Sequence, residues 1–140
     1  MNGKVIVTGG TGYIGSHTAV ELITAGFEVV IIDNLYNSDI SVLDGIRSIT
    51  GVTPKFYDYD LCDSQKLEEV FGAEGKVDAI IHFAAYKAVG ESVRKPLEYY
   101  RNNLTSLMNL LEAIERHNTT ALVFSSSCTV YGQPDTLPVT

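Results

Sequence analysis

The chain has 140 residues, 45% of them hydrophobic and 19% charged, which is the composition of a globular protein with its own hydrophobic core. Acidic residues outnumber basic ones by 17 to 10, and Lys and Arg form no cluster, so nucleic acid is excluded as a partner. No apolar run approaches the ~20 residues of a membrane span. Cys62 and Cys128 belong to no C-x-x-C pair or Cys/His cluster, so we expect reduced thiols, no metal site and a cytoplasmic protein.

Short runs rich in Val, Ile and Phe alternate with helical patterns along the chain. The predicted strands are Lys4 to Val7, Glu28 to Asp33, Lys55 to Tyr59, Asp78 to Phe83 and Ala121 to Ser126. The predicted helices are Tyr13 to Ala25, Val42 to Ile49, Ser64 to Glu74 and Pro96 to about His117. Four of the strand runs are almost continuously hydrophobic, which is typical of strands buried on both faces of a parallel sheet.

This alternation predicts an α/β fold with a doubly wound parallel sheet, strand order 3-2-1-4-5 and right-handed crossovers. In the last helix we expect one apolar stripe to face the core, formed by Leu104, Leu107, Met108, Leu111 and Ile114. Residues 133–138 have the composition of a loop with no element after it. We therefore expect the sheet to be truncated after its fifth strand and the chain to be a fragment.

A glycine-rich segment, Thr8-Gly9-Gly10-Thr11-Gly12-Tyr13-Ile14-Gly15, follows the first strand and leads into the first helix. A lone G-x-G-x-x-G is weak, but Asp33 closes the second strand 18 residues after Gly15, as a dinucleotide site requires. Glycines let the backbone approach a pyrophosphate, whose charge meets the N–H groups at the helix start. Asp33 would accept hydrogen bonds from the adenosine ribose and repel a 2′-phosphate, which favours NAD over NADP.

The spacing of Gly9, Gly12 and Gly15 also fits T-G-x-x-G-x-x-G, which resembles the extended branch of the short-chain dehydrogenase/reductase superfamily. Polar residues follow the other strands, at the edge where open sheets bind ligands. Three longer segments, 87–92 (KAVGES), 95–103 (KPLEYYRNN) and 124–132 (FSSSCTVYG), resemble the UDP-glucose 4-epimerase family within that branch. They are far more specific than the glycine motif.

The resemblance implies a Rossmann-like NAD-binding domain over residues 1–140, part of a homodimeric isomerase of galactose metabolism. NAD would take a hydride from C4 of a UDP-sugar and return it to the other face, interconverting UDP-glucose and UDP-galactose through a 4-keto intermediate. By resemblance, the cofactor contacts are Gly9, Gly12, Tyr13, Ile14, Gly15, Asp33, Asn34, Leu35, Tyr36, Asn37, Asp60, Leu61, Phe83, Ala84, Lys87 and Asn102. The substrate contacts are Lys87, Ala88, Val89 and Ser127.

Ser127 is the one catalytic residue that the resemblance assigns within the chain. Its hydroxyl can both donate and accept, so it can help to relay a proton from the sugar 4-hydroxyl. The family also needs a Tyr with a Lys four residues later, and none of the eight tyrosines here has one. The family places this pair beyond residue 140, so we expect the chain alone to be inactive.

Two other interpretations stay open at this stage. One is another extended-branch sugar-nucleotide enzyme, such as a different epimerase or a dehydratase, and the other is a non-catalytic module that senses NAD. For His17, His82 and His117 we expect structural roles rather than catalytic ones.

Overall fold

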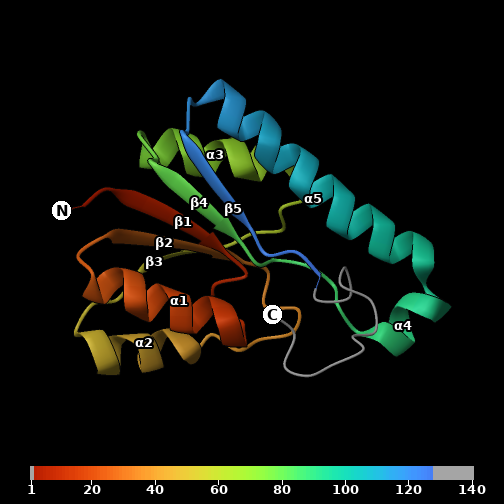
Figure 1. Cartoon of the computed structure of the whole chain (residues 1–140), viewed down its shortest axis with the longest axis horizontal. Helices are drawn as coiled ribbons and strands as arrows, with labels where there is room; N and C mark the ends of the chain where they lie inside the picture. The colour runs from red at the N-terminus through yellow and green to blue at the C-terminus, as the bar shows by residue number, and fades with distance from the viewer. Residues whose placement is uncertain (1, 128–140) are drawn as a thin grey trace, which may run out of the picture.

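A computed structural model describes residues 2–127 and contains one parallel sheet in the order β3-β2-β1-β4-β5, as predicted (Figure 1). The strands are β1 (Lys4–Thr8), β2 (Glu28–Asp33), β3 (Lys55–Asp58), β4 (Ala79–His82) and β5 (Ala121–Phe124). The helices are α1 (Tyr13–Thr24), α2 (Val42–Thr50), α3 (Ser64–Glu74), α4 (Val89–Arg94) and α5 (Pro96–Arg116). No helix in this part of the chain has the length and apolar character that a membrane crossing requires.

Helices cover both faces of the sheet, with α1 and α2 on one side and α3 and α5 on the other (Figure 1). Side chains along β1 alternate between the two layers: Val5 and Val7 join the cluster that contains Ala19 of α1, whereas Ile6 joins the one that contains Phe71 of α3. The central strands are buried on both faces, which explains why their runs are continuously hydrophobic.

The edge strand β5 is much less covered than its neighbours. Leu122 packs against the α3 and α5 layer, but Val123 and Phe124 are 57% and 51% exposed. The strand is also two residues shorter than predicted. Beyond Phe124 the Ser125 N–H donates to the His82 carbonyl at 3.1 Å, which links this part of the chain to β4, and Ser126 and Ser127 are exposed.

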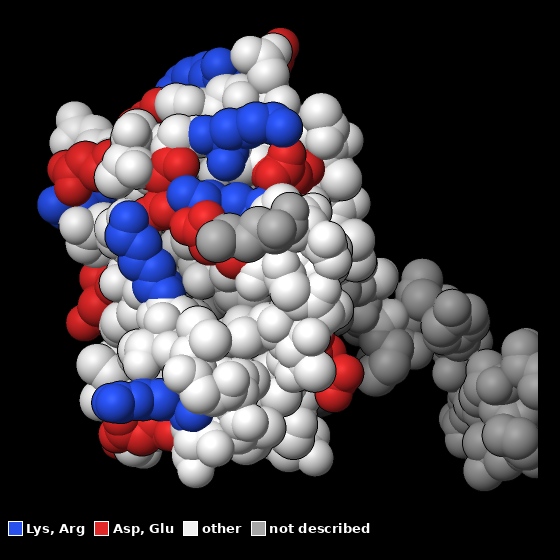
Figure 2. Space-filling model, turned by 90° about the vertical axis from the view of Figure 1, so that its left-hand side faces the viewer, with Lys and Arg blue, Asp and Glu red and all other residues white. Residues whose placement is uncertain are grey.

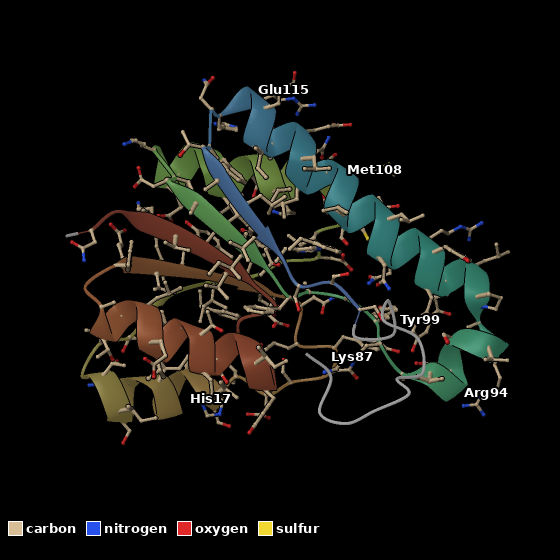
Figure 3. The ribbon with its side chains drawn as sticks, viewed as in Figure 1. His17, Lys87, Arg94, Tyr99, Met108 and Glu115 are labelled. Carbon is tan, nitrogen blue, oxygen red and sulfur yellow. The ribbon has the colours of Figure 1, made fainter. Side chains whose placement is uncertain are left out.

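The predicted apolar stripe of α5 is wrong in part. The buried residues of the helix are Tyr99, Ser106, Leu110 and Ala113, and of the predicted stripe Ile114 packs against the core. Leu104, Met108 and Leu111 are 45–55% exposed, and Met108 points away from the sheet (Figure 3). Apolar residues occur on both sides of this helix, so periodicity alone does not decide which side is buried. The smaller side chains of Ser106 and Ala113 let the helix backbone lie close to its neighbours.

Helix α4 was not predicted, although it immediately precedes α5. Lys95 separates the two helices with a backbone that is neither helical nor extended, φ −130° and ψ 52°. Proline disfavours the helical conformation in the residue before it, so Pro96 ends the short α4 and begins α5. The chain therefore turns sharply at Lys95, which places α4 beyond the carboxyl ends of the strands (Figure 1).

A buried carboxylate ties together the opposite end of the sheet, where the strands begin. The Glu74 side chain is 1% exposed and lies 2.9 Å from the Lys4 ammonium and 2.6 Å from that of Lys55. It also accepts a 2.5 Å hydrogen bond from the Tyr57 hydroxyl. Burial alone would raise the pKa of Glu74, but these hydrogen bonds outweigh it and lower the pKa to about 2. Basic and acidic side chains are interleaved over the upper part of this face (Figure 2).

We expect Glu74→Gln to lower the free energy of unfolding at pH 7 by about 3 kcal/mol. This value is near the lower limit for breaking a buried ion pair, because Lys4 keeps a second carboxylate partner, Glu28, at 3.1 Å. The folded pKa lies below the ordinary value of 4.5, so this contribution is present above about pH 4.5 and is lost as the pH falls toward 2. Urea unfolding between pH 7 and pH 2.5 measures both effects.

The matched control is Glu115→Gln, an exposed carboxylate on α5 that makes no ion pair with the described residues (Figure 3). It should leave stability unchanged within ~0.5 kcal/mol. Equal pH dependence in the wild type and in Glu74→Gln would contradict the assignment of a low pKa to Glu74.

Candidate dinucleotide site

The glycine-rich turn between β1 and α1 depends on a close approach of two backbone segments. A Cβ atom at Gly15 would lie 2.2 Å from the carbonyl oxygen of Gly9, and one at Gly10 would lie 2.7 Å from the Ile31 side chain. Gly9 itself has a φ of +69°, in the left-handed region. Only glycine fits these positions, so the first turn of α1 closes directly against the end of β1.

The N-terminus of α1 is open to a ligand. Gly12 is its N-cap residue, and within residues 2–127 no side chain accepts a hydrogen bond from the first N–H groups of the helix. Tyr13 and Ile14, which follow, are 81% and 52% exposed. An uncapped helix start with its positive dipole end exposed suits the pyrophosphate of a dinucleotide, as the sequence predicts.

Asp33, at the end of β2, connects this turn to the next loop. One of its carboxylate oxygens accepts from the backbone N–H of Thr11 at 3.1 Å, and the other accepts from that of Leu35 at 3.0 Å. The Ser38 hydroxyl bonds to Thr11 at 2.7 Å and donates to Asp33 at 3.4 Å. Leu35 has a φ of +55°, rare for a bulky residue, and its bond to Asp33 holds it there.

A pocket lies beside Asp33 at the carboxyl ends of β2, β3 and β4. It brings together eight of the predicted cofactor contacts: Asp33, Asn34, Tyr36, Asn37, Asp60, Leu61, Ala84 and Asn102. The Asn34 amide donates to the Asp60 carboxylate at 3.3 Å, which links the loops after β2 and β3. Asp60 also accepts from the Cys62 N–H at 2.8 Å. Residues from four separate parts of the chain thus meet in one place.

The pocket also contains residues that the sequence did not indicate, namely Tyr59, Tyr86 and Ser106. Tyr86 comes from the loop after β4, where its N–H donates to the Asn103 side chain at 2.8 Å. Ser106 is buried on α5. Only their positions in the sequence could have indicated Tyr59 and Tyr86, because each lies next to a predicted cofactor contact.

The remaining predicted contacts lie outside this pocket. The glycine turn holds five of them, and Leu35 lies in the loop after β2. Phe83 and Lys87 follow β4, and Lys87 is exposed between the end of the sheet and α4 (Figure 3). Ala88 is the N-cap of α4 and Val89 is its first residue, 76% exposed. Ser127 is exposed, three residues past the end of β5.

His82 is buried at the end of β4, where its Nδ1 lies 2.7 Å from the Thr8 hydroxyl. Burial lowers the pKa of His82 to about 4, so the ring is neutral at physiological pH. The same hydroxyl receives a long, 3.5 Å hydrogen bond from the Ala84 N–H. His82 therefore anchors the loop after β4 to β1, and its geometry agrees with the structural role expected for it.

Cys62 follows Leu61 outside the pocket beside Asp33 and is a half-buried free thiol, whose Sγ lies 3.6 Å from the Asn102 carbonyl oxygen. Burial, together with the negative charge of Asp60, raises the pKa of Cys62 to about 11. The thiol is thus uncharged and unreactive at neutral pH. Among the residues that the structure describes, no group of three or more His, Cys, Asp or Glu side chains could hold a metal ion.

The open parallel sheet, with its order β3-β2-β1-β4-β5 and a glycine turn after β1, defines a dinucleotide-binding fold of the Rossmann type. In such folds the ligand site lies where the strand order reverses. Residues 5–140 match the model of the NAD dependent epimerase/dehydratase family. The chain belongs to that family.

Curated relatives carry a more specific description. The chain is 53% identical over 136 residues to the UDP-glucose 4-epimerase of Bacillus subtilis (strain 168), covering 97% of this chain and 40% of that protein. It is 54% identical over 134 residues to the UDP-glucose 4-epimerase of Yersinia pestis, covering 96% of this chain and 39% of that protein. The chain thus spans about two fifths of the length of these relatives.

Solved structures of the same kind superpose closely. A UDP-glucose 4-epimerase from Stenotrophomonas maltophila, with bound NAD and formylated UDP-arabinopyranose, has a TM-score of 0.92 at 46% identity, covering 99% of this chain and 41% of that one. A UDP-glucose 4-epimerase from Bifidobacterium longum, in complex with NAD⁺ and UDP, has a TM-score of 0.91 at 50% identity, covering 98% of this chain and 41% of that one.

Proposed function

We propose that this chain is the NAD-binding part of a cytoplasmic UDP-glucose 4-epimerase. The observation that carries the proposal is a likeness to epimerases at about 50% identity over nearly the whole chain, on a fold whose pocket brings together eight of the sixteen expected NAD contacts. The free thiol of Cys62 supports a reducing compartment.

The residues present fit the pyrophosphate and the adenosine half of NAD. The uncapped start of α1 would bind the pyrophosphate, and Asp33 has lone pairs left to accept bonds from the adenosine ribose. Asp60 and Leu61 would border the adenine. When bound, NAD⁺ supplies an acceptor for the hydride from sugar C4.

Lys87 and Ser127 are the residues that we propose to meet the sugar nucleotide. Lys87 is exposed and forms no ion pair within residues 2–127, so its charge is available for a phosphate. The Ser127 hydroxyl would hydrogen-bond the sugar 4-hydroxyl and pass on its proton, but a hydroxyl is a weak base at neutral pH. We propose that the stronger base, a Tyr paired with a Lys, belongs to the part of the protein corresponding to the rest of its longer relatives.

Asp33→Ala should weaken NAD binding to the chain by roughly ten- to a hundredfold, because hydrogen bonds to a charged acceptor are lost. NADP binding should fall much less, since the same substitution removes the charge that repels a 2′-phosphate. Isothermal titration calorimetry with both dinucleotides gives the ratio.

The control for this experiment is Ser38→Ala, which removes a loop contact of Asp33 but keeps its carboxylate. It should change both affinities by the same factor. If Asp33→Ala also weakens NAD and NADP equally, Asp33 acts only by holding the glycine-rich turn, and the ribose assignment is wrong.

The activity is tested by joining residues 1–140 to the remainder of the Bacillus subtilis relative. We expect no conversion of UDP-galactose to UDP-glucose by the chain alone and measurable conversion by the chimera in a coupled assay. Ser127→Ala should lower the kcat of the chimera by ~10²-fold or more. Ser48→Ala, at an exposed position on α2, is the matched control and should have no effect. Turnover by the isolated chain would disprove our placement of the base.

We also propose that the protein forms a homodimer through the outer face of α5. Five exposed apolar residues recur there at helical spacing, namely Leu97, Tyr100, Leu104, Met108 and Leu111. A second copy would cover them in a two-fold arrangement. Met108→Lys should shift the sedimenting mass of the chain from dimer to monomer, whereas Glu115→Lys should not. A monomeric wild type at high micromolar concentration would refute this proposal.

A further inference from the structure

Two tyrosines that line the proposed dinucleotide pocket, one from the loop after β2 and one from the loop after β4, meet in a tilted ring contact. The ring centroids of Tyr36 and Tyr86 are 4.7 Å apart, with an angle of 30° between the ring planes. Tyr36 lies in the loop after β2 and Tyr86 in the loop after β4, and both line the pocket. Because β1 separates β2 from β4 in the sheet, the ring pair spans the carboxyl end of β1.

We propose that the Tyr36–Tyr86 ring pair is a latch that closes the adenosine end of the pocket and slows the release of the dinucleotide. This inference rests on the proposed NAD binding, and it assigns to Tyr86 a role that its sequence position does not indicate. The adenosine end is identified by Asp33 and Asp60, which lie in the same pocket.

Tyr86 is the fixed half of the latch. Its backbone N–H and carbonyl bond to the amide side chain of Asn103 at 2.8 and 2.9 Å. Its ring meets the buried Tyr99 edge to face at 5.5 Å, and the Tyr99 hydroxyl donates to Glu91 at 2.8 Å. These contacts attach Tyr86 to both α5 and α4, and in Figure 3 Tyr99 lies between the two helices and the loop that carries Lys87.

Tyr36 is the half that moves. Its side chain is 50% exposed, and its backbone N–H is held only by the Asn34 side chain, at 3.2 Å. The Tyr36 ring can leave Tyr86 by rotation of its own side chain, which keeps the Leu35 N–H bonded to Asp33 at 3.0 Å. Opening therefore costs one ring contact and little else, which suits a loop that admits and releases a ligand.

The experiment measures the release of NADH from the chain by stopped-flow fluorescence, with excess NAD⁺ as the displacing ligand. Tyr36→Ala should speed release roughly three- to tenfold, the range that the loss of one aromatic pair predicts. Tyr36→Phe keeps the ring and should release NADH at the wild-type rate. The control is Ile49→Ala, which removes an apolar side chain that is 71% exposed on α2 and does not line this pocket.

A double-mutant cycle separates the latch from a general loss of structure. The double variant Tyr36→Ala/Tyr86→Ala should release NADH no faster than the faster of the two single variants. Each single substitution already removes the same ring contact, so the second removes nothing more. Additive effects, or a wild-type release rate in Tyr36→Ala, would overturn the latch while leaving the proposed function intact. If the wild-type chain binds no NADH at all, the proposed function fails, and the latch fails with it.

Discussion

The site depends on the contact between Gly15 and Gly9. With no side chain at Gly15, the first turn of α1 lies directly against the carbonyl of Gly9, where a Cβ atom would be 2.2 Å away. This contact keeps the start of α1 beside the end of β1 and leaves its N–H groups open to a phosphate. It also brings Thr11 within reach of Asp33. A single steric constraint thus positions the helix start that we propose to bind the pyrophosphate, and it orients the carboxylate that we propose to bind the ribose.

The two ends of the sheet differ in what their polar side chains do. Where the strands begin, Glu74 holds Lys4 and Lys55 in a buried ionic cluster that serves stability. Where they end, loops carry polar side chains into a shared pocket. Stabilising charges are thereby kept away from the ligand, so the loops around the pocket can differ without loosening the core.

The sequence predicted the sheet well because β1 and β2 are buried on both faces, and few structures other than a parallel sheet bury such runs. The glycine turn and Asp33 were predictable because each forms local contacts. The buried face of helix α5 was less predictable, since apolar residues lie on both of its sides. Only packing decides that Leu110 is buried and Leu104 is exposed. The Tyr36–Tyr86 contact joins two loops that are distant in sequence, and no local pattern encodes such a meeting.

Asp33 serves two purposes at once, and this restricts how the chain can evolve or be engineered. Its carboxylate accepts from the backbone N–H groups of Thr11 and Leu35, which no other described side chain satisfies. A change of nucleotide preference at this position must remove a negative charge and still supply two acceptors. Exchanging Asp33 alone loosens the turn on which the phosphates rest, so a switch of preference requires a second, compensating substitution nearby, with Ser38 the nearest candidate. Cofactor choice in this chain is therefore linked to the rigidity of its first loop.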